Sequence, residues 1–298
     1  MKIIDKNLSL YSVQNRSNST YVNKPVKDLT DSVAFTSRLK TGKTLLKLTG
    51  GINSDTVKTL DKINEPLEFL EASYSLIRKT LGFSEEIAPP VTLEKLDKNL
   101  CAVYMPNSNM IYFNSEYQNL AKPELFSYLR HELRHTEQCY NGMRTKGFMD
   151  KAVDMLADNT ERVNLNNFRN FIKENSVDNL IELSKNNEID DEFMALALKA
   201  KQSMGKGENN YKMFEEELYD AEYPIIKHVW KDLQTKIINS LGIIPEGAKK
   251  AKESERLFLS MMKQPECGSV QYYFSEHEAD AFGVQGLTYI KYLLSRLL

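Results

Sequence analysis

The sequence predicts a predominantly helical α+β fold with a small antiparallel sheet placed just before a long helix. Three observations support this class. Apolar residues recur at helical spacing through most of the second half of the chain. Two short β-rich segments lie together between residues 100 and 114. No internal repeat of fixed period is visible, which argues against a solenoid or a propeller.

Composition and charge limit the classes of partner that we expect and indicate the cellular compartment. Lys and Arg number 39 and Asp and Glu 41, so the net charge of −2 gives no electrostatic reason to expect nucleic-acid binding. No apolar segment approaches the roughly 20 residues that cross a bilayer, so we expect no membrane span. The N-terminus lacks the apolar core of a secretory signal, and three scattered cysteines are typical of a reducing compartment. We therefore expect a cytoplasmic protein, although a protein that is exported without a signal peptide would have the same sequence features.

The chain divides into an arm and one domain. Residues 1–50 are predicted to form a flexible N-terminal arm, because residues 7–37 are rich in Ser, Asn and Thr with few periodic apolar positions. Such an arm could serve as a pro-segment that blocks a cleft. Residues 51–298 can bury one large core, and we expect a single domain there with a long helical insertion at about residues 150–262.

The first strongly predicted helix covers about residues 65–81. Pro66 suits the first turn of a helix and Gly82 suits its end. The next two segments read LCAVYM and MIYFN, and the turn residues PNSN separate them, which predicts a β-hairpin over residues 100–114.

A helix at about residues 123–141 follows the hairpin. Pro123 stands near its start and Gly142 is the predicted end. Further helices are predicted at about residues 150–158, 160–174, 177–185, 190–204, 211–240, 246–262 and 270–297.

The helix at 123–141 carries the segment LRHELRHTEQ, which holds two of the four histidines of the chain. Side chains four residues apart lie on one helix face, so His131 and His135 can bind one metal ion. Glu132 is turned away by about a quarter of the circumference and would lie beside the ion, where it can take a proton from water as the general base. The alternative is a surface helix without metal, but the apolar side supplied by neighbouring leucines opposes it.

Three protein ligands are typical of a catalytic zinc site, so a third must come from elsewhere in the chain. The segment FSEHEADAFG offers Glu276 as the ligand and Asp280 as the acceptor for a hydrogen bond from a ligand histidine. Glu216 and Asp220 have the same spacing and remain a rival pair. Cys139 lies one turn beyond His135, too far along the helix for the same ion, and is interpreted as a buried apolar residue.

His-Glu-x-x-His at 131–135, followed by Glu-x-x-Ala-Asp at 276–280, resembles the gluzincin metallopeptidases. The local sequence is similar to CAAX-prenyl-endopeptidase-like and ImmA/IrrE-like peptidases. The resemblance covers residues 109–142 and 274–283, and the membrane-spanning helices of some relatives are absent here.

The resemblance implies a zincin-like fold, with Glu276 as the third ligand of Zn²⁺ and Asp280 beside a ligand histidine. It also implies that a strand before the motif helix forms a sheet edge that pairs with the substrate. The residues in that position are Met110, Ile111, Tyr112, Phe113 and Asn114.

Three further side chains could donate a hydrogen bond to the negative charge that develops in a transition state. These candidates are His228, His277 and Tyr273. For each of them the alternative is an ordinary packed or solvated side chain.

These features predict a zinc-dependent endopeptidase that acts on a peptide or protein substrate. Zn²⁺ would activate a water molecule, and Glu132 would take its proton and pass it to the leaving amine. The alternative is a helical interaction or scaffold protein with structural zinc or none. Glu132 favours catalysis, because a structural site has no use for it.

Overall fold

The computed structural model describes residues 42–158, 165–186, 189, 191–218, 224–263 and 269–298. The fold is predominantly helical with one small sheet, as the sequence predicts. No helix of these residues combines the length and the apolar character needed to cross a bilayer.

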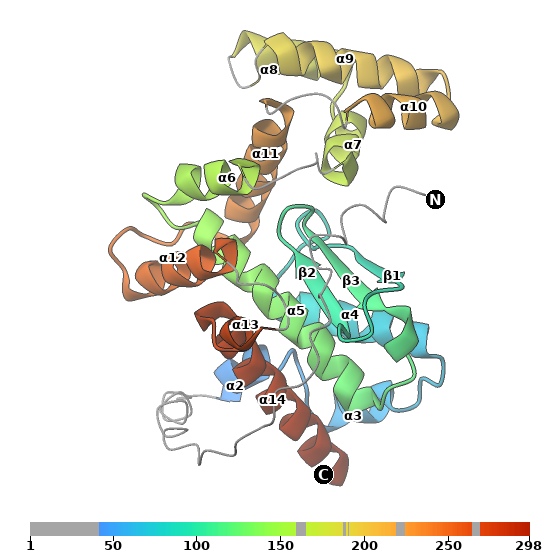
Figure 1. The fold of residues 1–298 in the computed structure, drawn as a ribbon, viewed down its shortest axis with the longest axis vertical. Helices are drawn as coiled ribbons and strands as arrows, with labels where there is room; N and C mark the ends of the chain where they lie inside the picture. Colours follow the sequence, from blue (N-terminus) through green and yellow to red (C-terminus); the bar gives the residue numbers. More distant parts are fainter. Residues whose placement is uncertain (1–41, 159–164, 187–188, 190, 219–223, 264–268) are drawn as a thin grey trace.

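The long helix α5 (Lys122–Met143) runs through the centre of the molecule (Figure 1). Its start agrees with the predicted position, and Leu125, Phe126, Leu129 and Leu133 are fully or almost fully buried. Helix α14 (Glu276–Leu297) packs along one side of it, and α4 (Pro66–Leu81) and the strand β2 (Ala102–Met105) pack on other sides. Because it is covered from several directions, α5 can bury polar side chains that a surface helix would expose.

In the described residues, two shorter helices precede α4. These are α2 (Gly42–Leu48) and α3 (Ser54–Leu60). α4 begins at a proline and ends at Gly82, whose φ of 81° is the left-handed conformation that favours glycine. Both boundaries confirm the prediction.

The predicted arm of residues 1–50 is too long at its C-terminal end. Residues 42–48 form α2, and Thr49 is fully buried. The guanidinium of Arg130 donates to the carbonyl of Leu48 at 2.9 Å, so this segment is part of the folded domain. The rest of the predicted arm, residues 1–41, lies outside the described residues.

The sheet has three strands in the order β1-β3-β2. β2 and β3 (Met110–Asn114) form the predicted antiparallel hairpin, with Tyr104 opposite Ile111. β1 (Val91–Glu94) is an additional strand parallel to β3, so the sheet is mixed and the prediction of a purely antiparallel sheet is wrong. β3 is also the central strand. The predicted edge strand, Met110–Asn114, therefore pairs on both sides, and in the described sheet β2 is the edge strand that faces α5.

The remaining helices form the predicted helical region, in the upper and left parts of Figure 1. The predicted helix 211–240 is two helices, and residues 219–223 between them lie outside the described residues. The bounds of the group are α6 (Met149–Asp158), α7 (Leu165–Glu174), α8 (Val177–Lys185), α9 (Asp191–Gly205), α10 (Glu208–Leu218), α11 (Pro224–Leu241) and α12 (Lys249–Met262). The predicted last helix is also two, α13 (Val270–Tyr273) and α14.

Gly142 does not end α5 as predicted, because the helix continues to Met143. Its role is close packing. A Cβ atom added at Gly142 would lie 2.5 Å from Cδ2 of Phe258 in α12, so only glycine allows the two helices to approach this closely.

We expect Gly142→Ala to lower the free energy of unfolding by about 1–3 kcal/mol, because overpacking outweighs the gain in helix propensity. The matched control is Gly283→Ala in α14, where an added Cβ meets no atom of the described residues within 4 Å. That change should raise stability by about 0.5–1 kcal/mol. Urea unfolding of both variants measures the difference, and equal effects of the same sign would contradict this explanation.

Candidate metal centre

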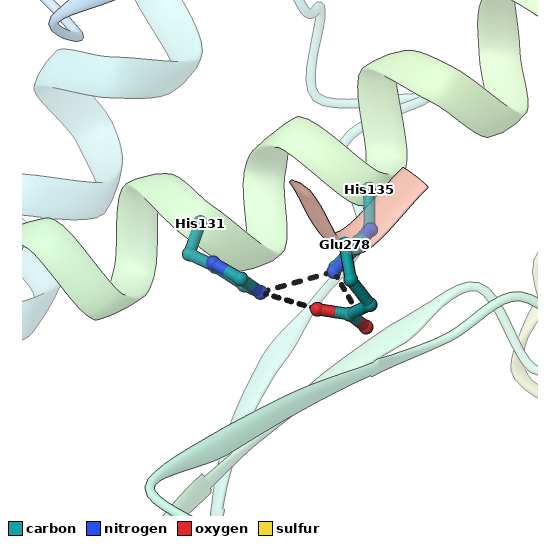
Figure 2. A group of neighbouring side chains, drawn as sticks. All are labelled: His131, His135 and Glu278. Atoms are coloured by element: carbon teal, nitrogen blue, oxygen red, sulfur yellow. Dashed lines mark hydrogen bonds and ion pairs between the residues drawn. The ribbon is translucent and has the colours of Figure 1, made fainter. Parts of the chain in front are cut away.

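The two histidines of the motif lie side by side on α5, one turn apart (Figure 2). His131 and His135 are each 6% exposed, and their Nε2 atoms are 3.1 Å apart. Two buried ring nitrogens at this distance, both aimed at one point, are more typical of residues that share a metal ion than of residues on an ordinary surface helix.

A carboxylate from α14 completes the cluster (Figure 2). Glu278 Oε2 lies 3.3 Å from Nε2 of His131, and Oε1 lies 3.3 Å from Nε2 of His135. The Glu278 side chain is 2% exposed, and α14 packs against α5 along this segment. The three residues form a buried group that could hold a metal ion.

The spacing of the ligand atoms fits a small divalent cation. Two ligand atoms at about 2.0–2.1 Å from a tetrahedral metal ion lie about 3.3 Å apart. The separations in the cluster are 3.1 Å between the two Nε2 atoms and 3.3 Å from each Nε2 to a different oxygen of Glu278. One ligand atom from each of the three residues lies within 4.8 Å of the others, so the group is compact enough for one small cation.

The charges of the cluster also favour a cation. Burial by itself raises the pKa of Glu278, but hydrogen bonds and charge interactions with the two histidines lower that pKa well below its usual value. Burial likewise opposes protonation of His135, yet the contacts with Glu278 raise its pKa to about 9. A buried carboxylate that stays ionised needs a positive partner, which can be a proton on the imidazole or a metal ion.

The predicted third ligand, Glu276, is wrong. Its side chain is 50% exposed and forms an ion pair with Arg256 at 2.9 Å. Glu276 and Glu278 are two residues apart on one helix, so they point about 200° apart. The face of α14 that packs on α5 carries Glu278 together with Ala281 and Tyr292, which are both buried.

Asp280 does not accept from a ligand histidine as predicted. It accepts hydrogen bonds from Nε of Arg134 at 2.6 Å and from Nε2 of Gln138 at 2.8 Å. The residue in contact with the histidine is Gln138, whose Oε1 lies 2.9 Å from Nδ1 of His135. Since the Gln138 amide nitrogen also donates to the carbonyl of His277, its oxygen is the acceptor. Nδ1 of His135 therefore carries a proton, and Nε2 can present a lone pair when the ring is neutral.

Glu132 lies next to the cluster and also contacts the sheet. Its Oε2 accepts a hydrogen bond from the backbone N–H of Tyr104 in β2 at 2.6 Å. Burial raises the pKa of Glu132, while the charges of His131 and His135 lower it. Glu132 is not one of the three grouped ligands, as the sequence predicts, and it joins the motif helix to the edge of the sheet.

Among the described residues, His277 is the only predicted transition-state donor whose side chain contacts a residue of the cluster. It is buried, its Nδ1 lies 2.9 Å from Oγ of Ser260, and its Nε2 lies 3.7 Å from Oε1 of Glu278. Burial lowers the pKa of His277 to about 4, so the ring is neutral at neutral pH.

The other two candidates lie farther out. Tyr273 is half-exposed, and its ring packs on Phe282, which in turn packs on His131. His228 in α11 packs on Phe193 of α9, and α9 lies at the top of Figure 1, away from α14. The structure therefore does not bring His228 to the cluster.

Two further predictions concern Cys139 and the rival pair of acids. Cys139 is fully buried, its thiol contacts the sulfur of Met143, and burial raises its pKa to about 12, all of which agree with an apolar role. For the rival pair, the side chain of Glu216 and the whole of Asp220 lie outside the described residues.

Comparison of the chain with protein-family models, with curated proteins and with solved structures gives no match.

Proposed function

We propose that this protein is a zinc-dependent endopeptidase with a zincin-like active site of the gluzincin type. The observation that carries the proposal is the buried cluster of His131, His135 and Glu278 with Glu132 beside it. Two imidazoles and one carboxylate with an open fourth position are a common ligand set of catalytic zinc. The two imidazole nitrogens disfavour calcium, which takes six to eight oxygen ligands.

A zinc ion held by these three side chains would polarise a peptide carbonyl and lower the pKa of a water molecule to roughly 7. Glu132 then acts as the general base and takes a proton from the attacking water. It passes that proton to the leaving amine, which makes it the general acid of the second step. The hydrogen bond from Tyr104 holds Oε2 of Glu132, and Oε1 is left to exchange the proton.

The edge of β2 is the surface on which an extended peptide would add to the sheet. The N–H of Tyr104 points away from β3, because it donates to Glu132. Ala102 precedes it by two residues in the same strand, so its backbone groups point the same way. A substrate strand hydrogen-bonded to Ala102 would pass close to Glu132, and main-chain bonds of this kind bind peptides of many sequences.

Replacement of Glu132 by Gln tests the catalytic role. An amide can still accept from Tyr104, so we expect the fold and the zinc content to be unchanged. Loss of the base should lower the rate of peptide hydrolysis by a factor on the order of 10²–10⁴. The measurements are zinc content of the purified chain, then cleavage of unfolded casein and of a peptide library by both proteins.

The control is Glu124→Gln, which removes one charge from the same helix. The amide preserves the hydrogen bond that Glu124 makes to Ala121 at the start of α5. This variant should cleave at the wild-type rate. The opposite outcome is a protein that binds one zinc ion per chain but shows no hydrolysis that depends on Glu132, both as the full chain and after removal of residues 1–41. That outcome would support a helical interaction protein with structural zinc.

A further inference from the structure

A cavity of about 480 Å³ lies beside α5 on a face that differs from the one holding the metal cluster. Arg130 lines this cavity and precedes His131 by one residue, so the two faces are about 100° apart around the helix. The other walls come from α2, from α12 and from the C-terminal ends of α4 and α11. This cavity takes no part in the proposed hydrolysis.

Much of the cavity wall is apolar. A cavity of this size that combines an apolar area with polar and charged groups has room for a small organic ligand. The apolar residues of the wall are Leu48, Leu81, Phe83, Tyr140, Leu241 and Leu257.

The charged groups around the cavity carry an excess of positive charge. Arg130 and Arg134 also line it, but their charges are matched by Glu137 and Asp280 in hydrogen-bonded ion pairs. The excess comes from the three further cations Lys47, Arg144 and Lys250, against the single additional carboxylate of Glu253.

Among the described residues, none of these three cations has a hydrogen bond or ion pair to a carboxylate within 4 Å. Arg144 donates to the carbonyl of Gly242 at 2.6 Å and to the side-chain oxygen of Asn141, which are both uncharged. Lys250 is exposed, but partial desolvation of its ammonium group lowers its pKa, and repulsion by Arg144 and Lys47 lowers it further. The groups are therefore close enough to repel one another, and an anion between them would relieve that repulsion.

Arg130 gives independent support for an anion in this cavity. Its side chain is 1% exposed, and its Nη1 atom is buried without a hydrogen-bond partner among the described residues. A buried guanidinium nitrogen that lacks an acceptor is costly, and an anionic oxygen is the acceptor it binds best.

We propose that this cavity binds a small organic oxyanion, with the phosphate or carboxylate between Lys47, Arg144 and Lys250 and a ring or alkyl group against the apolar wall. The excess of cations favours the dianionic phosphate over the singly charged carboxylate. The inference stands whether or not the protein is a peptidase, because it uses none of the residues that would bind zinc.

Calorimetric titration of the full chain with four probes tests the proposal. The probes are phenyl phosphate, benzoate, inorganic phosphate and benzyl alcohol, each at an ionic strength of about 0.15 M to screen weak surface contacts. We expect saturable binding of one phenyl phosphate per chain, weaker binding of benzoate and of inorganic phosphate, and no binding of benzyl alcohol. Tighter binding of benzoate would overturn the phosphate preference, and equal affinity for inorganic phosphate would overturn the role of the apolar wall.

The double variant Lys47→Ala/Lys250→Ala should bind phenyl phosphate at least about tenfold more weakly, a loss of about 1.4 kcal/mol. Both lysines are exposed, so the fold should not change, which urea unfolding can verify. The matched control is Lys249→Ala/Lys252→Ala, which removes two exposed lysines of α12 that do not line the cavity. The same loss in both double variants, or no saturable binding by the wild type, would overturn the proposal.

Discussion

Replacing Glu278 by Gln is expected to weaken zinc binding by more than about 100-fold, because it removes a ligand itself, and loss of an outer partner alone costs 10–100-fold. The isosteric amide keeps the shape of the side chain but removes the charge that lies 3.3 Å from both imidazoles. Zinc should therefore raise the midpoint of thermal unfolding of the wild type by mass action and leave that of the variant almost unchanged. Titration of the chelator-treated proteins with zinc measures both quantities.

The matched control is Glu276→Gln, two residues earlier in the same helix. Its carboxylate is half-exposed and pairs only with Arg256 among the described residues, so the variant should bind zinc as the wild type does. The pair of variants separates the two acids of the segment EHEAD. If Glu276→Gln lost zinc and Glu278→Gln kept it, the cluster described above would not be the metal site.

Replacing Glu137 by Ala is expected to lower the free energy of unfolding by about 3–5 kcal/mol, the usual cost of leaving a buried charge without its partner. Glu137 accepts from Nη2 of Arg130 at 2.7 Å and from Arg134 at 3.3 Å. The Arg130 side chain is 1% exposed, so loss of the carboxylate leaves its guanidinium largely desolvated and without its ionic partner. Urea unfolding of the metal-free proteins measures the difference without a contribution from zinc.

An exposed pair of the same chemistry provides the comparison for Glu137. Arg78 and Glu85 are 3.0 Å apart, but the Glu85 side chain is 88% exposed. Glu85→Ala should change stability by no more than about 1 kcal/mol, because water replaces the lost carboxylate. A similar loss in both variants would show that burial of Arg130 is not what makes the Glu137 pair important.

Local sequence signals were sufficient for the parts of the site that lie within one element. A proline at the start and a run of apolar residues defined α5, and the four-residue spacing alone placed His131 and His135 together. The hairpin of β2 and β3 followed in the same way from two β-rich segments around a turn. In each case the partners are close in sequence, so their geometry depends on little else.

Pairings between distant segments were not visible in the sequence. β1 is only four residues long, and it pairs in parallel with β3, from which residues 95–109 separate it in the chain. Neither its length nor a turn signal therefore predicts this strand. Its presence moves β3 to the centre of the sheet and makes β2 the edge beside Glu132. Gln138 was missed because an amide within a polar helix face has no motif, and its role depends on Asp280 and His277 in α14.

The sequence by itself determined the two histidines, the glutamate between them and the helix that carries all three. Only the tertiary structure brings an acid of α14 to them, because packing between helices that are distant in the chain leaves no local sequence signal. Within α14, periodicity itself favours Glu278, which lies around the helix between the apolar positions Ala281 and Tyr292 on one side and Phe282, Tyr289 and Leu293 on the other, whereas Glu276 lies at least about 100° from both. The resemblance to Glu-x-x-Ala-Asp pointed to Glu276 instead. Packing against α5 buries the first side, which turns Glu278 toward the histidines and leaves Glu276 in solvent.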